Sequence, residues 1–419
     1  MNKIFSSLLL IVSVVLIQLP IAVDALAAEA EKSNKPERKT QLVGPTVGKK
    51  VAKAFEAYSA DDIPGALAIL LEIDASKKYD KAYVSRFIAI MYAQMGDEEA
   101  KAIQYLKAAV EPDILNEGDQ DQSLKLLADL QMQTKAFEEA LVNYKAWMDF
   151  TGKSDGDTWT KIANANYMLK RLDKMIVPAD NAIAAYGDKH NKNPYILKIT
   201  SYYESKKYQD AVKTLETVLQ IFPEDKTWWN QLGMFYLLVE DYKKALATLD
   251  MAYKQGFLEK ESEIKTLASL YSQNDVPYKA AVLLEKHIDS GLVTRDDKNL
   301  SSLANAWHAS QHIDKAAKYY GELAKMTNSA KHYSKQGMLL KQDEQFKAAI
   351  VALNKALDLG AKNKGRLQMS IAESHFYLEE YKQAYKAINL AMKDPKTKKS
   401  AKGWVDFIKD TARRKKVSI

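Results

Sequence analysis

The stretch from Trp229 to Ala252, WNQLGMFYLLVEDYKKALATLDMA, decides the fold expected for this chain. Its large side chains recur every three or four residues on both sides of the polar pair Glu240-Asp241, which predicts two helices joined by a tight turn. Gly233 and Ala245 fall one on each helix, where small side chains let the two backbones approach closely. Large residues fill the space around that contact, namely Trp229, Leu232, Tyr236 and Leu249.

The small residues of this helical hairpin recur along the chain. Ala211 lies 34 residues before Ala245 and occupies the same position in the preceding unit. In the other units this position is occupied by Ala66, Ala102, Ala140, Met175, Ala280, Ala316, Ala349 and Ala384. The position of Gly233 is occupied by Ala89, Ala128, Ala163, Ile199, Ala268, Ala304, Gly337 and Ala372. Met175 and Ile199 are the large exceptions. A hairpin of this size cannot bury its apolar face alone, so consecutive hairpins are expected to stack.

The spacing W-x2-L-G-x2-Y, followed by alanine, resembles the tetratricopeptide repeat (TPR) family. The resemblance covers about ten units, which is almost the whole chain after residue 50. It implies an all-α fold, a right-handed superhelical solenoid of about ten TPR helical hairpins over residues 51–392. Trp404, Phe407 and Ile408 lie at helical spacing, which predicts a capping helix at 397–415 within a final segment, 393–419, that ends in a basic tail.

The N-terminus has the features of an export signal. Lys3 precedes an apolar run from Ile4 to Val23, and Ala25-Leu26-Ala27 has the small-x-small form that signal peptidase requires. Residues 1–27 are therefore predicted to be a signal peptide cleaved near Ala27, which places the mature chain in the periplasm. The alternative is an uncleaved inner-membrane anchor that leaves the chain facing the periplasm. Residues 28–50 are rich in Glu, Lys, Ser, Pro and Gly, which predicts a flexible linker.

Motifs for catalysis, metal binding and cofactor binding are missing from the sequence. There is no cysteine, which excludes disulfides, thiolate zinc sites and cysteine nucleophiles and suits an oxidising compartment. Gly360 and Gly365 are spaced as in a phosphate-binding loop, but Arg366 follows where lysine is required. His308 and His312 are four residues apart, and no third ligand accompanies them. We expect no enzyme activity, no cofactor and no metal.

A partner-binding surface is implied by the TPR resemblance. In TPR proteins, positions 2, 5, 9, 12 and 13 of each first helix line an inner groove. Positions 9 and 12 of the central units form an aromatic and aliphatic patch of Tyr167, Tyr203, Met234 and Leu237. Such a patch, on a surface that folding does not require to be apolar, is the default partner site. The alternative is that neighbouring helices or turns cover it.

A second candidate site is a carboxylate clamp. Some TPR domains hold the C-terminal carboxylates of a peptide with Lys and Asn side chains from three consecutive units. The resemblance places Lys265, Ser269, Ser302, Lys331 and Lys335 at those positions. The charges match such a clamp, but both Asn are replaced by Ser, which shortens the hydrogen-bonding reach.

Positive charge is concentrated in the C-terminal tail. Ten Lys or Arg and three Asp lie between Lys393 and Lys416, a net charge of +7, which equals the formal net charge of the whole chain. This tail is predicted to make peripheral contact with anionic lipid or with an acidic partner, and simple solubility is the alternative. Export from the cytosol makes nucleic acid an unexpected partner.

Together these features predict a non-catalytic protein-binding scaffold or adaptor in the bacterial cell envelope, with one or more envelope proteins as partners. The chain resembles periplasmic all-TPR proteins that accompany TonB/ExbB/ExbD-type systems, which implies an accessory of an energy-transducing transport complex. The alternative is a periplasmic binder of a small ligand or a cell-wall glycan, which would need a closed polar pocket with ordered aromatic side chains. The sequence leaves the partner's identity and the oligomeric state open.

The export prediction can be tested directly. We expect the exported protein to begin near Ala28, because the small side chains of Ala25 and Ala27 fit the signal peptidase pockets. Intact mass and N-terminal sequencing of the protein recovered from the envelope measure this. A membrane-bound chain that retains Met1 would instead establish the anchored alternative.

Overall fold

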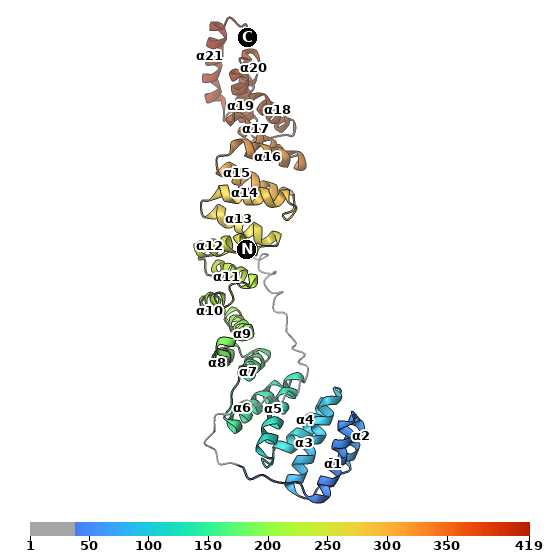
Figure 1. Cartoon of the computed structure of the whole chain (residues 1–419). Coiled ribbons are helices and arrows are strands. Elements are labelled where there is room, and N and C mark those ends of the chain that lie inside the picture. The colour runs from blue at the N-terminus through green and yellow to red at the C-terminus, as the bar shows by residue number, and fades with distance from the viewer. Residues whose placement is uncertain (1–37) are drawn as a thin grey trace. The chain divides into compact units, whose positions relative to one another are not determined.

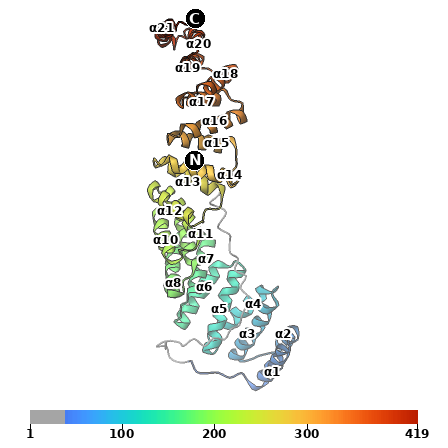
Figure 2. The ribbon, with the colours of Figure 1, turned by 45° about the horizontal axis from the view of Figure 1, so that its top comes forward.

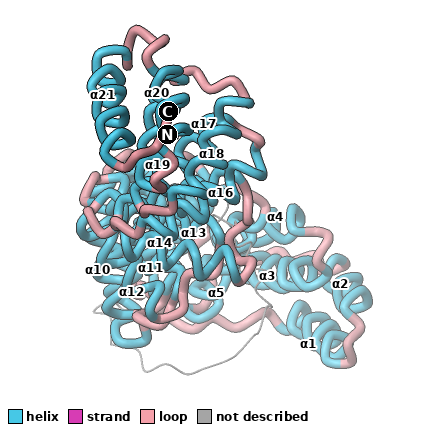
Figure 3. Tube along the Cα trace, turned by 90° about the horizontal axis from the view of Figure 1, so that it is seen from above, coloured by secondary structure: helices cyan, strands magenta, loops and turns pink. Residues whose placement is uncertain are grey.

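The computed structural model describes residues 38–419, which form helices joined by short loops, with no strand in that range (Figures 1 and 3). The chain divides into two compact units, the first ending at Ser154 and the second beginning at Asp155. The repeat register does not predict this division. The predicted signal peptide, residues 1–27, and the first part of the predicted linker lie outside the described residues.

Consecutive helices pair as hairpins in both units, three in the first and seven in the second, followed by one more helix. The first unit contains α1 (Pro45–Ser59), α2 (Ile63–Leu71), α3 (Lys78–Met95), α4 (Glu99–Val110), α5 (Glu117–Gln133) and α6 (Phe137–Thr151). The second contains α7 (Gly156–Met168), η2 (Leu172–Met175), α8 (Ile176–Tyr186), η3 (Gly187–Lys189), α9 (Lys192–Glu204), α10 (Tyr208–Ile221), α11 (Lys226–Leu238), α12 (Tyr242–Lys254), α13 (Glu261–Gln273), α14 (Pro277–Asp289), α15 (Asp297–Ala309), α16 (Ile313–Thr327), α17 (Ala330–Gln342), α18 (Phe346–Asp358), α19 (Lys364–Tyr377), α20 (Tyr381–Ala391) and α21 (Lys398–Arg414).

This arrangement confirms the predicted fold class, an all-α array of ten TPR-like hairpins with a C-terminal cap. Within the second unit the helices follow one another in sequence order from α7 to α21 (Figure 2). None of the helices between residues 38 and 419 is both long enough and apolar enough to cross a membrane.

Close helix crossings hold each hairpin together. The ten residues at the recurring second-helix position are all buried with no exposed surface, namely Ala66, Ala102, Ala140, Met175, Ala211, Ala245, Ala280, Ala316, Ala349 and Ala384. At Gly233 a Cβ atom would lie 2.5 Å from Cδ2 of Leu249 on the partner helix, and at Gly337 it would lie 2.6 Å from Cγ of Leu353. The predicted meeting of small and large residues is therefore the contact that sets the helix separation.

Three hairpins depart from the regular pattern. In the fourth, the fully buried Met175 ends a short 3-10 turn, η2, that precedes α8, whereas the other second helices begin directly as α-helices. In the fifth, Ile199 is buried at the position where the other units have Ala or Gly. In the sixth, Trp228 is more deeply buried than Trp229, whose Nε1 donates to the backbone oxygen of Pro223 at 2.7 Å.

The turn within each hairpin contains one residue with a positive φ angle, and this residue is glycine in only one unit. Gly96 has φ +81°, and the other nine hairpins place a non-glycine residue there: Asp61, Lys135, Lys170, Lys206, Glu240, Asp275, Gln311, Glu344 and Glu379. In the sixth hairpin the N–H of Asp241 bonds to the oxygen of Tyr236 at 2.9 Å, which satisfies a carbonyl at the end of α11. The Asp241 side chain then accepts from the N–H of Lys244 at 3.0 Å and caps α12. The polar pair in the sequence thus ends one helix and starts the next.

The chain before α1 is docked on the first unit from Arg38 onward. The Arg38 guanidinium donates to the backbone oxygen of Asp113 at 3.0 Å. Gln41 and Asn116 exchange two hydrogen bonds, from the Gln41 backbone N–H at 2.9 Å and back to the Gln41 oxygen at 3.1 Å. The structure therefore differs from the predicted linker, because these residues are extended but fixed by specific contacts.

Helix α1 also begins inside the segment predicted as linker. Pro45 occupies its first turn, where the missing N–H costs nothing. Val47, Val51 and Ala54 are buried at a spacing of four and three residues, so a short apolar stripe is enough to build the helix against α2.

The predicted cap is confirmed as α21. Ala401, Val405, Ile408 and Ala412 are buried at helical spacing, and α21 packs on α20. Phe407, predicted on the same apolar side, is 48% exposed, and its ring centroid lies 5.0 Å from that of Phe376 on α19.

The crossing contact predicts the effect of a larger side chain. We expect Ala245→Leu to lower the free energy of unfolding by about 1–3 kcal/mol, because the added atoms have no space between α11 and α12. Thermal or urea melting of the purified protein measures this. Lys243→Leu is the control, since Lys243 is exposed two residues away and should melt within about 0.5 kcal/mol of the unaltered chain. Equal melting of both variants would show that the assigned register is wrong.

Candidate protein-binding site

The predicted patch residues lie on three consecutive first helices of the second unit, α7, α9 and α11, and all four are half-buried. Tyr167 on α7 donates from its hydroxyl to Oε1 of Glu204 on α9 at 3.2 Å. Burial, together with the negative charge of Glu204, raises the pKa of Tyr167. This hydrogen bond joins the two helices at the end of the predicted surface.

Tyr203 connects the surface to the core. Its ring centroid lies 5.8 Å from that of the buried Phe235 on α11, edge to face, and 6.0 Å from that of Tyr208. Tyr203 and Leu237 both pack against the core of the second unit. Met234, which precedes Leu237 by three residues on α11, is half-buried. These side chains therefore support the fold as well as offering part of their surface.

More exposed apolar residues occur on the same helices. Met168 on α7 is 38% exposed and Ile196 on α9 is 41% exposed. In the repeat register they occupy positions 13 and 5, which line the TPR groove, so the signal that could have found them was present in the sequence. Positions 9 and 12 alone do not include them.

The first three residues of the predicted clamp already have partners close in sequence. Lys265 forms an ion pair with Glu261, one turn earlier on α13, at 3.3 Å. The Ser269 hydroxyl accepts from Nε2 of Gln273 at 3.1 Å. The third, Ser302, donates to a backbone oxygen four residues earlier in α15 at 3.0 Å. All three are exposed, so a ligand could compete for them at the cost of these local contacts.

The two remaining clamp residues lie on α17. Lys331 is exposed and forms no ion pair with any described residue. Lys335 is half-buried, with Nζ 5.9 Å from the centroid of the Tyr320 ring. Burial lowers the pKa of His308 on α15, and the positive charge of Lys335 lowers it further.

The second histidine of the spaced pair is held in an aromatic cluster. The ring of His312 lies 5.0 Å from that of Trp307 and 5.2 Å from that of Tyr278, and its Nδ1 is 2.9 Å from the backbone oxygen of Ser310. No group of three or more potential metal ligands occurs between residues 38 and 419.

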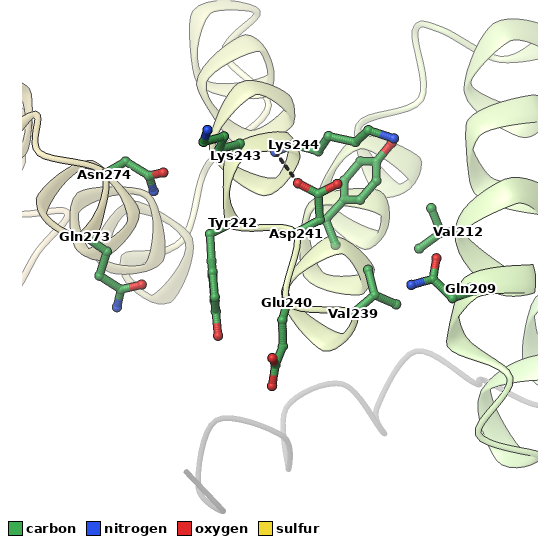
Figure 4. A pocket seen from close by; sticks show the side chains of 11 residues that line it. Gln209, Val212, Val239, Glu240, Asp241, Tyr242, Lys243, Lys244, Gln273 and Asn274 are labelled. Atoms are coloured by element: carbon green, nitrogen blue, oxygen red, sulfur yellow. Dashed lines mark hydrogen bonds between the residues drawn. The ribbon is translucent and has the colours of Figure 1, made fainter.

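A hollow of about 810 Å³ lies beside the turn between α11 and α12 (Figure 4). Its lining is mostly polar and comes from α10, the α11–α12 turn and the end of α13: Gln209, Val212, Tyr236, Val239, Glu240, Asp241, Tyr242, Lys243, Lys244, Gln273 and Asn274. The Tyr242 side chain is 45% exposed at its edge, and Nζ of Lys244 lies 5.3 Å from the centre of the Tyr236 ring. This open hollow lacks the enclosed aromatic walls that a sugar ring needs for stacking.

The consecutive hairpins define a helical-repeat protein. The tetratricopeptide repeat family matches the sequence at residues 202–263, which include the stretch that decided the fold. Residues 202–263 therefore match a tetratricopeptide repeat, and TPR repeats are typically non-catalytic scaffolds. No curated protein matches the sequence significantly.

Several solved structures are similar to parts of this chain. YrrB, described as a TPR protein with an unusual peptide-binding site, is 16% identical with a TM-score of 0.34, covering 48% of this chain and 97% of its own. The MamA protein is 18% identical with a TM-score of 0.33, covering 42% of this chain and 95% of its own. Cut9–Hcn1 of the APC/C is 12% identical with a TM-score of 0.28, covering 86% of this chain and 84% of its own.

The clamp can be tested with a defined peptide. If Lys331 and Lys335 hold carboxylates, the double variant Lys331→Glu/Lys335→Glu should weaken binding of a peptide with an acidic C-terminus by about tenfold or more, since charge-assisted hydrogen bonds contribute about 1.5–3 kcal/mol each. Calorimetric titration measures the affinity. The same peptide with an amidated C-terminus is the control, and equal binding of the acid and amide forms would exclude a clamp.

Proposed function

We propose that this chain is a non-catalytic scaffold that captures an extended segment of a partner protein along the first helices of its second unit. The observation that carries the proposal is the apolar surface of α7 and α9, where Met168 and Ile196 are exposed although the core does not need them. Half-buried Tyr203 and Leu237 continue this surface onto α11. We call these four residues, with Tyr167 and Met234, the inner-face patch.

The chemistry of the inner-face patch suits a mixed apolar and polar segment. Aromatic side chains supply large, rigid contact area at little entropic cost, and the exposed methionine adapts to side chains of different shape. The Tyr167 hydroxyl and the Glu204 carboxylate provide a polar edge that can bind backbone N–H groups of a partner. A partner segment bound here would cover apolar surface that is now in contact with water.

We further propose that the scaffold works in the bacterial cell envelope, on the periplasmic side, as an accessory of a TonB-type energy-transducing transport complex. The export pattern that ends at Ala27 and the absence of cysteine support a periplasmic location. The uncleaved form would place the same scaffold on the inner membrane, facing the periplasm. The transport complex is proposed from overall resemblance to periplasmic all-TPR proteins.

The alternative function, binding of a small ligand or a cell-wall glycan, would depend on an enclosed pocket. The open hollow beside Tyr242 is lined largely by charged and amide side chains, which favours the scaffold over the glycan binder.

The inner-face patch makes a specific prediction about capture. Met168→Gln together with Ile196→Gln should leave the melting temperature nearly unchanged, because both side chains are exposed, and should reduce partner capture by more than tenfold if the partner docks here, about 1–2 kcal/mol for each side chain. Proteins retained from envelope extract by the immobilised variant and by the unaltered chain can be quantified by mass spectrometry.

A matched control exists on the second helices of the same unit. Met251 on α12 and Val282 on α14 are 44% and 41% exposed, so Met251→Gln/Val282→Gln removes similar apolar surface from the other side of the hairpins. This control should retain the same partners as the unaltered chain. Equal loss in both variants, or loss in neither, would contradict capture at the inner-face patch.

A further inference from the structure

Positive charge is gathered on the last hairpin and its cap, over a wider area than the tail. Twelve Lys or Arg and three Asp lie between residues 381 and 416, a net charge of +9, so the rest of the chain has a net charge of −2. All twelve cationic side chains are exposed: Lys382, Lys386, Lys393, Lys396, Lys398, Lys399, Lys402, Lys409, Arg413, Arg414, Lys415 and Lys416. Helix α20 contains no acidic residue.

The two helices place much of this charge on one continuous surface. Lys382 and Lys386 lie one turn apart on α20, and Lys402 and Lys409 lie two turns apart on α21. Nζ of Lys409 is 5.4 Å from the centre of the Tyr385 ring on α20, so the basic side of α21 meets α20 beside its lysines. Figure 1 shows α20 and α21 side by side at the C-terminal end of the array. We call the cations from Lys382 to Arg413 the C-terminal basic face.

Three acidic residues lie among these cations, and the exposed Asp406, on α21 between Lys402 and Lys409, forms no ion pair with any described residue. Asp394 accepts from the N–H of Gly365 at 3.2 Å and from the N–H of Lys396 at 3.0 Å. Asp410 pairs with Arg413 in the same helix at 3.4 Å. The seven lysines between residues 382 and 402 form no ion pair with any described residue. This face therefore contains unneutralised like charges, which repel one another.

Folding of the cap does not require this charge. The buried stripe of Ala401, Val405, Ile408 and Ala412 provides the apolar contact with α20, and Lys402 and Lys409 are exposed beside it. Large apolar side chains are also exposed around the basic face: Leu390 by 41%, Phe407 by 48% and Val417 by 41%. Cations interspersed with exposed apolar side chains are the composition of surfaces that sit at a bilayer interface.

We propose that the C-terminal basic face docks on the surface of an anionic lipid bilayer. The charge is diffuse and comes mainly from flexible lysines, which act as point charges, whereas recognition of single carboxylates favours the fixed fork of arginine. Leu390, one turn after Lys386 on α20, would enter the headgroup region, and anionic headgroups would neutralise the lysines around it. This inference is independent of the inner-face patch and of the partner it captures.

The absence of cysteine from the chain allows a local test in the full-length protein. Ser400→Cys places one thiol among the lysines of α21, and Ser262→Cys places one on the exposed surface of α13, for attachment of a fluorophore whose emission rises in a bilayer interface. The local readout is needed because the apolar N-terminal segment of the full chain would bind any bilayer. With vesicles containing about one third phosphatidylglycerol, the label at residue 400 should respond and the label at residue 262 should not.

Charge neutralisation should remove that response. Each lysine near an anionic surface contributes about fivefold to the docking constant, so Lys382→Gln/Lys386→Gln/Lys402→Gln should lower the constant obtained from the fluorescence by at least tenfold. About 0.5 M salt should have a similar effect. The matched control, Lys207→Gln/Lys243→Gln/Lys347→Gln, removes three other exposed lysines that form no ion pair in the described chain and should dock like the unaltered protein.

Three results would overturn the proposal. An equal response of the label at residue 400 to vesicles of phosphatidylcholine alone would show that charge plays no part. An equal effect of the two triple variants would show that net charge, and not this face, drives docking. Tighter binding to poly-glutamate or to duplex DNA than to the anionic vesicles, at equal charge concentration, would assign the face to a different macromolecule.

Discussion

The close approach of two helix backbones is the constraint on which the rest of this structure depends. Each hairpin brings its helices together at a residue with little or no side chain, and a large residue of the facing helix fills the space beside it, as Leu249 does against Gly233. Close packing of this kind is sensitive to single methyl groups, because the atoms around the contact have no free volume into which they can move. The same contact repeated ten times fixes the separation of twenty helices, and α21 then covers the last of them.

This packing constraint also explains which residues are available for binding. The core of each hairpin is built from one side of each helix, so residues on the opposite side of the first helices can vary without loss of packing. Met168 and Ile196 use that freedom to expose apolar surface. Tyr203 belongs to both classes, because its ring packs on the buried Phe235 while part of it reaches the surface. Substitution at such a residue changes stability and binding together, whereas Met168 and Ile196 allow the two effects to be separated.

Charged side chains are distributed along the array differently from exposed apolar side chains. Outside the C-terminal basic face the acidic and basic residues nearly balance in number, and some of the cations are paired, as in the pairs of Lys226 with Glu259 and Lys192 with Asp225, each at 2.6 Å. Such exposed pairs contribute little stability, and they keep the surface close to neutral. On α20 and the start of α21 the lysines are left without counter-charges, although the fold gains nothing from them. Unpaired charge of one sign on an ordered helix surface is a feature that binding explains and folding does not.

The sequence by itself determined the helical hairpin, its repeat and the capping helix, because these depend on local periodicity and on small residues at fixed spacing. It also gave the register that contains Met168 and Ile196. Only the tertiary structure decided that Tyr203 and Leu237 pack on the core, that Lys265 is paired with Glu261, and that Arg38 to Gly44 dock on the first unit. The tertiary structure also brings the lysines of α20 and α21 together on one surface. These outcomes depend on which side chains from separate helices meet in space, and the period of a repeat contains no information about that.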